Sequence, residues 1–96
     1  MGGLTKETSV IEISMPTQHI VQAIRASQGP EGAAPGTEIT GASLSQGVVR
    51  YRAQVDGQDR MLEDDVEAVL SFLHVTSGRL VDVSYDPAGL VSFTLA

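Results

Sequence analysis

Two segments near the C-terminus, 80–85 and 90–95, alternate apolar with polar residues and are joined by Asp86-Pro87-Ala88-Gly89. Such alternation is typical of a strand with one buried face. Pro87 presets one turn torsion and Gly89 accepts a positive φ, so the junction favours a tight reversal. The end of the chain is therefore predicted to be a β-hairpin. The residues expected to meet on its buried face are Val81, Val83, Tyr85, Val91, Phe93 and Leu95.

A second group of strands is expected in the middle of the chain. Residues 48–55 alternate clearly, whereas 38–45 is rich in Thr and Ser and predicts a weaker strand, of the kind found at a sheet edge. Gln46-Gly47 can close a hairpin between them, and Asp56-Gly57 is a strong turn signal. After that turn, residues 58–62 are expected to fold back only briefly before a helix begins.

Two helices are predicted. Residues 10–15 alternate as a strand, and Pro16 suits the first turn of a helix that follows it and stops at Gly29-Pro30. A second helix is expected to begin near Asp64, because an acid there and Glu67 three residues later resemble a capping box. The apolar stripe of this second helix comprises Leu62, Val66, Val69, Leu70 and Leu73.

The element order predicted from these patterns is β-α-β-β-α-β-β, an α+β fold. It matches a ferredoxin-like split βαβ with an extra C-terminal strand, in which right-handed crossovers place two helices on one face of an antiparallel sheet. The alternative is a meander of the later strands with the first helix packed loosely. Residues 1–8 are expected to be a loose leader and 9–96 a single domain, with 29–37 as a mobile loop.

Composition limits the functions that such a domain can have. The 96 residues include no Cys, which excludes disulfides and thiolate metal sites, and no Trp, so the core must be aliphatic. The formal net charge of −6, with Lys6 as the only lysine, disfavours binding to nucleic acid or to anionic membranes. No apolar run reaches the length of a membrane span, and no signal-peptide pattern is present, so a cytoplasmic location is expected.

Acidic residues gather before and within the start of the second predicted helix. They could hold a divalent cation or dock a basic partner, but their spacing does not fit an EF-hand loop. Carboxylates at a helix N-terminus, where the helix dipole is favourable, are the simpler explanation, and no metal or other cofactor is predicted. The candidate docking acids are Asp56, Asp59, Glu63 and Asp64.

Arg50 and Arg52 are predicted to project from one face of their strand, where they could contact an anion. Cross-strand pairing with Glu38 or Glu12 explains them more simply. His19 and His74 are expected at the surface, and the chain contains no nucleotide-binding, zincin or nucleophile-elbow motif. No catalytic residue is predicted.

Apolar residues outside the expected core suggest a contact surface. The candidate interface residues are Phe72, Val75, Leu80 and Leu90, of which the last two would lie on the exposed face of the final hairpin. A core as small as this one also favours association. We therefore expect a non-enzymatic, self-associating interaction module that regulates or inhibits a larger protein. The alternative is a domain that binds a small molecule or an anion, with or without catalysis, near residues 29–36.

Overall fold

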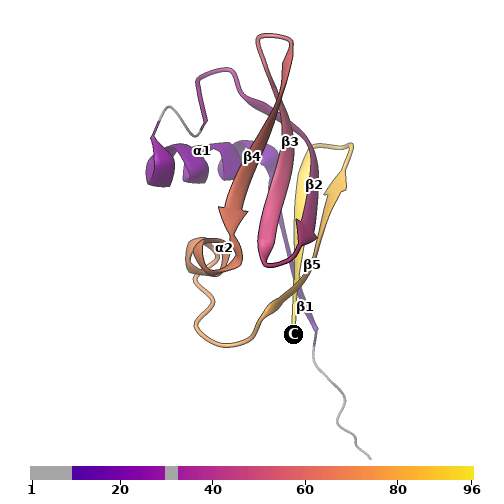
Figure 1. Ribbon diagram of the computed structural model, residues 1–96. Helices are drawn as coiled ribbons and strands as arrows, with labels where there is room; N and C mark the ends of the chain where they lie inside the picture. The colour runs from indigo at the N-terminus through magenta and orange to yellow at the C-terminus, as the bar shows by residue number, and fades with distance from the viewer. Residues whose placement is uncertain (1–9, 30–32) are drawn as a thin grey trace, which may run out of the picture.

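The computed structural model describes residues 10–29 and 33–96, so the predicted leader and residues 30–32 of the predicted loop lie outside the described residues. Figure 1 shows two helices beside a set of long antiparallel strands. In chain order the elements are β1 (Ile11–Pro16), α1 (Thr17–Gln28), β2 (Glu38–Ser45), β3 (Val48–Val55), β4 (Gln58–Asp65), α2 (Val66–Phe72), β5 (Leu80–Asp86) and β6 (Leu90–Leu95). The predicted α+β class is confirmed.

The predicted ferredoxin-like sheet is wrong, because the strands form two separate antiparallel sheets. One has the order β1-β6-β5 and the other has the order β2-β3-β4. β2 lies beside β5, yet no hydrogen-bonded ladder joins them. The first strand therefore pairs with the last strand of the chain, and α1 carries the chain from one sheet to the other.

The turn chemistry of the sequence is confirmed at all three hairpins. Gln46 and Asp56 adopt φ values of 54° and 53°, and the glycine after each one is also at positive φ, as a two-residue hairpin loop requires. In the final hairpin the Asp86 carboxylate accepts a hydrogen bond of 2.9 Å from the Ala88 N–H, and Gly89 has φ 95°. Local sequence therefore decides where these strands reverse.

β4 corrects the prediction that only residues 58–62 fold back before a long second helix. It pairs with β3 along its whole length, from Val55↔Gln58 to Val48↔Asp65. α2 therefore begins at Val66, and Asp65, not Asp64, precedes it with no side-chain cap. The ladder with β3 continues through residues 63–65, and a helix that started earlier would have to give up this pairing.

A β-bulge interrupts one strand of each sheet and changes which side chains face the core. In β5 the register shifts between Leu80 and Asp82, so Leu80 is only 7% exposed while Val81 is 41% exposed. In β2 a similar shift between Ile39 and Gly41 lets both Ile39 and Leu44 face inward, although their spacing breaks simple alternation. The predicted inward position of Val81 is therefore wrong, and Leu80 takes its place in the core.

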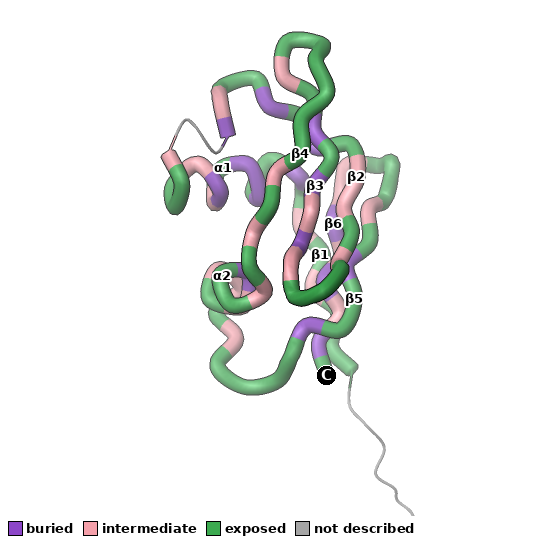
Figure 2. The backbone as a smooth tube through the Cα atoms, in the orientation of Figure 1, coloured by how far each residue is buried: buried purple, intermediate pink, exposed green. Residues whose placement is uncertain are grey.

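The core lies between the two sheets and the helices, as the buried segments in Figure 2 indicate. α1 contributes Ile20, Val21 and Ile24, which pack against inward residues of both sheets such as Val49 and Phe93. The helix ends as predicted at Gly29, whose φ of 78° suits glycine. No described helix is long and apolar enough to cross a lipid bilayer.

The structure also shows how the chain returns from α1 to β2. Arg25 donates hydrogen bonds through Nε to the Ala33 carbonyl, at 2.8 Å, and through Nη2 to the Ala34 carbonyl, at 3.1 Å. Ala33 itself is buried in the core. Of the predicted mobile loop, residues 33 and 34 are thus held by α1.

Candidate functional site

β1 is an edge strand whose exposed end is apolar. It pairs with β6 from Ile11↔Leu95 to Pro16↔Leu90 and, among residues 10–29 and 33–96, has no strand on its other side. Val10 is 60% exposed and Ile11 is 59% exposed, which makes them the two most exposed of the large apolar residues described. We call the open side of residues 10–15 the β1 edge. Unpaired backbone groups on such a strand can accept another strand.

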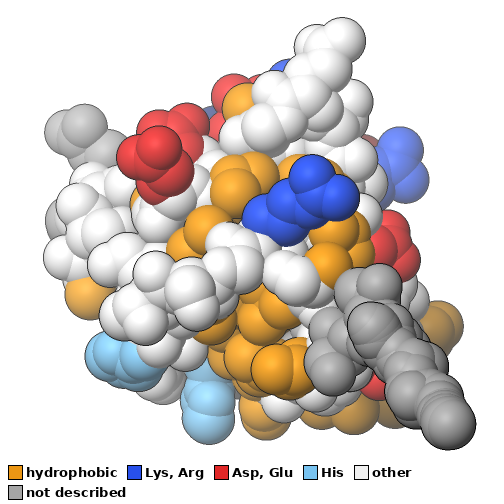
Figure 3. All heavy atoms as spheres, turned by 90° about the horizontal axis from the view of Figure 1, so that it is seen from below, with side chains coloured by type: hydrophobic (Ala, Val, Ile, Leu, Met, Phe, Trp, Pro, Cys, Tyr) orange, Lys and Arg blue, Asp and Glu red, His pale blue; other side chains and the backbone are white. Residues whose placement is uncertain are grey.

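Apolar hollows lie next to the β1 edge. One of about 290 Å³ is lined by Ile11 and Ile13 of β1 together with Val75 and Leu95. A second, more open one brings Met15 close to Phe72 of α2. Figure 3, seen from below, shows hydrophobic side chains gathered over the middle of this face, with histidine side chains at its margin. The β1 edge is therefore continuous with an apolar surface.

The predicted interface residues do not form one exposed patch. Phe72 and Val75 are half-buried against the core and line the hollows beside β1. Leu80 is a core residue because of the β5 bulge, and Leu90 is half-buried opposite Pro16. The structure thus groups Phe72 and Val75 with Ile11, Ile13 and Met15 of β1. Alternation identified the strand, but it carries no signal that the strand lies at an edge.

The predicted docking acids are spread along β4 instead of gathering at a helix N-terminus. Asp56 lies in the turn before β4, Asp59 pairs with Gln54 at 3.2 Å, and Glu63 forms an ion pair with Arg50 at 3.0 Å. In the described part of the chain, no three His, Asp or Glu side chains converge on a possible metal position. The candidate docking acids therefore lie along β4 and the turn before it.

Asp64 differs from the other acids because it points to the side of β4 that packs on the core. Burial, and then the nearby Asp65, raise the pKa of Asp64 above its ordinary value. Burial, and then the charge of Asp64, raise the pKa of Tyr51 well above its usual range. Tyr51 therefore keeps its proton at neutral pH.

The outer face of the β2-β3-β4 sheet carries the two predicted anion contacts, and the structure separates their roles. Arg50 is bound to Glu63, and not to the predicted Glu12 or Glu38. Arg52 forms no ion pair with any residue in 10–29 or 33–96. A side chain at Gly41 would come within 3.3 Å of the Arg52 Cδ atom, so the stem of Arg52 lies across the bare backbone of β2.

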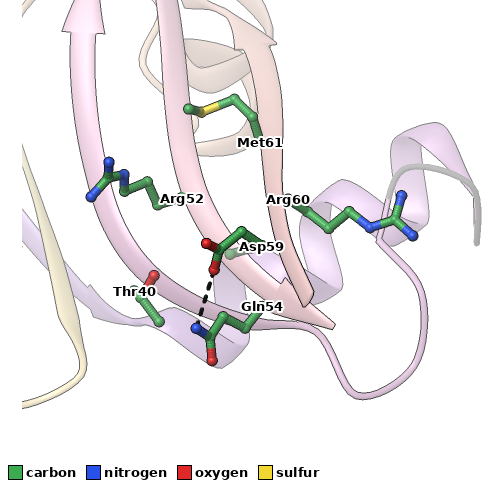
Figure 4. Close-up of a pocket in the computed structure, with 7 residues that line it drawn as sticks. Thr40, Arg52, Gln54, Asp59, Arg60 and Met61 are labelled. Atoms are coloured by element: carbon green, nitrogen blue, oxygen red, sulfur yellow. Dashed lines mark hydrogen bonds between the residues drawn. The ribbon is translucent and has the colours of Figure 1, made fainter. Parts of the chain in front are cut away.

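Shallow depressions flank Arg52 on this outer face. In Figure 4, Arg52 and Met61 extend to one side of the sheet and Arg60 extends to the other. The depression drawn in Figure 4 is also lined by the hydrogen-bonded pair Gln54 and Asp59 and by the Thr40 hydroxyl. A basic group with hydroxyl neighbours is able to contact a carboxylate or a phosphate.

The two histidines, His19 and His74, are both exposed. His74 is exposed just after α2 with a φ of 59°, and His19 is exposed on α1 near Met15. Neither forms a hydrogen bond with a carboxylate or hydroxyl group among the described residues. Both histidines are therefore surface residues without a hydrogen-bonded acid or hydroxyl partner in the described part of the chain.

Comparison of the chain with protein families, with curated proteins and with solved structures finds no match in any of the three.

Proposed function

We propose that this protein is a non-enzymatic interaction module that binds an extended protein segment at the β1 edge, and that it regulates or inhibits a larger protein in this way. One observation carries the proposal: no strand of the described part of the chain pairs with the second side of β1, and its exposed residue Ile11 adjoins an apolar hollow. An added strand would bond to the free backbone groups of β1.

Specificity would come from the side chains of the added strand. Residues of a strand alternate between faces, so every second side chain of the added segment would extend the surface formed by Ile11, Ile13 and Met15. The opposite side chains would lie beside Glu12 and Ser14, which favours small, polar or basic residues there. The expected partner segment therefore alternates apolar residues with polar ones.

Site-specific photo-crosslinking tests this proposal. A benzophenone amino acid is placed at Ile11 and, as the matched control, at Met61, which is 55% exposed on the other sheet. In a lysate of the native host we expect a protein adduct from position 11 that an excess of the unlabelled chain displaces. Equal labelling at both positions, or no adduct at position 11, would contradict the proposal.

Arg52 supports a second candidate function, the binding of an anionic small molecule. Its charge has no ionic partner in the described residues, and its stem is held over Gly41. We propose this site on the outer face, whereas the site expected from the sequence was near residues 29–36. Titration with inorganic phosphate and with acetate, followed by amide chemical shifts, tests it. Shift changes around Arg52 that vanish in Arg52→Gln are expected, whereas unchanged shifts in this region would remove the candidate.

A further inference from the structure

We infer that a second copy of this chain occupies the β1 edge, so that two β1 strands pair antiparallel around a twofold axis. The inference rests on the proposed function because it uses the same edge, but it takes a second copy of this chain as the added strand. A twofold axis perpendicular to the sheet makes the β1 strands of the two copies antiparallel. By the same symmetry, the same residues of each copy form the contact. The β1-β6-β5 sheet of one copy would thereby join the same sheet of the other copy, giving one continuous sheet with the order β5-β6-β1-β1-β6-β5.

The two faces of β1 limit the possible registers. Ile11, Ile13 and Met15 share one face, which lines the apolar hollows, and Glu12 and Ser14 share the other. Directly opposed residues in an antiparallel pair point to the same side of the sheet. A twofold axis perpendicular to the sheet must therefore lie between one residue and its own copy in the other molecule. In such a register, apolar side chains of one copy meet apolar side chains of the other.

The residues that each axis would set opposite each other then favour the axis at Ile13. An axis at Glu12 would set the two Glu12 carboxylates directly opposite each other, which is unfavourable. An axis at Ser14 would place Pro16, which has no N–H to donate, opposite Glu12 inside the ladder. With the axis at Ile13, Ile13 faces its copy, Ile11 faces Met15, and Glu12 faces Ser14.

Charge also explains why the second copy would not use β4, the outer strand of the other sheet. β4 carries acidic residues on both of its faces, including Asp59, Glu63 and Asp64, so it would meet Glu12 of an incoming β1 with like charge. In addition, the Gln28 side chain donates a hydrogen bond of 3.3 Å to the Glu63 carbonyl of β4. Pairing of β1 with β1 closes on itself, whereas pairing of β1 with β4 would propagate into a chain of molecules.

Single cysteines test this register against a clean background, since the natural chain has no Cys. Under mild oxidation we expect Ile13→Cys to form a disulfide-linked dimer, because directly opposed Cβ atoms lie about 4.5–5.5 Å apart. Ile11→Cys alone should not link, because in this register the two copies of residue 11 are about 13 Å apart along the strands. A mixture of Ile11→Cys and Met15→Cys should link. Met61→Cys is the exposed control and should remain monomeric.

Sedimentation of the unmodified chain provides a readout that does not depend on any variant. A dimer at about 100 µM, which dissociates on dilution, supports the inference. A strict monomer at that concentration, or linkage of Met61→Cys as efficient as that of Ile13→Cys, overturns it. If the chain is monomeric while Ile11 still labels another protein, the second copy is wrong and the proposed function stands. If Ile11 labels no protein at all, both fail.

Discussion

β1 and β4 are the outer strands of different sheets, and they present opposite surfaces. The exposed end of β1 is apolar, with Ile11 59% exposed, and one side of this strand pairs with no other strand that the structure describes. β4 exposes mainly charged side chains, and Gln28 from α1 bonds to one of its carbonyls. Charge and coverage are two common means by which proteins prevent pairing between sheet edges. The molecule thus protects one edge and leaves the other able to pair.

The same comparison separates stability from association. β6, the central strand of the β1 sheet, buries Val91, Phe93 and Leu95, so that sheet is anchored in the core through β6. β1 adds only half-buried side chains to the core, at Ile13 and Met15. Changes in β6 should therefore unfold the protein, whereas changes at the exposed end of β1 should alter association alone.

The largest expected effect is the loss of Phe93. Phe93→Ala removes a fully buried ring from the strand that carries β1, and should lower the free energy of unfolding by about 3–5 kcal/mol. Leu62→Ala, a half-buried position on β4, is the comparison and should cost clearly less. Urea denaturation measures both values. Equal losses at the two positions would show that the two sheets are anchored alike.

The next effect concerns the β1 edge itself. Ile11→Lys places a charge on the open strand and should weaken dimerisation at least tenfold, which corresponds to about 1.4 kcal/mol. Stability of the isolated chain should change by no more than about 0.5 kcal/mol, because the side chain is exposed. Sedimentation and denaturation of dilute samples provide the two measurements. Met61→Lys, at a similarly exposed position, should leave association unchanged.

Ionic strength should act in opposite directions on the edge contact and on the ion pair beside β4. Two copies that each carry a formal net charge of −6 repel each other, so added salt should strengthen the dimer. Arg50→Gln breaks the exposed pair with Glu63 and should cost no more than about 0.5 kcal/mol, with the difference disappearing in high salt. A dimer that dissociates as salt is added would point to an ionic contact instead of an apolar one.

The smallest effect is the pH dependence due to Asp64. Its pKa is raised in the folded state, so the folded protein holds this proton more tightly than the unfolded chain does. Stability from this group is therefore present below the raised pKa and is lost as the pH rises through it. Asp64→Asn should remove that dependence and stabilise the protein at neutral pH by about 0.5 kcal/mol or less. A variant less stable than the parent at pH 7 would mean that the ionised carboxylate has a favourable partner.

Sequence patterns identified both end strands, the first helix and the three tight turns, yet they misplaced elements whose pairing is distant along the chain. Residues 63–65 have the composition of a helix start, but their ladder with β3 makes them a strand. The single-sheet prediction failed because β1 pairs with β6, about 80 residues later in the chain, and β2 does not pair with β5. Irregular spacing of Ile39 and Leu44 was the one local sign of a bulge.

Local chemistry was sufficient wherever one or two residues decide the backbone. Positive φ at Asp56, Gly57 and Gly89 sets two of the reversals. The expectation of an aliphatic core was wrong in part, because Tyr51 and Phe93 are among the largest fully buried side chains. The tertiary structure alone decided which strand is an edge, that Leu80 is buried, and that Arg50 pairs with Glu63. These properties depend on neighbours brought together by folding, and alternation along a strand contains no information about them.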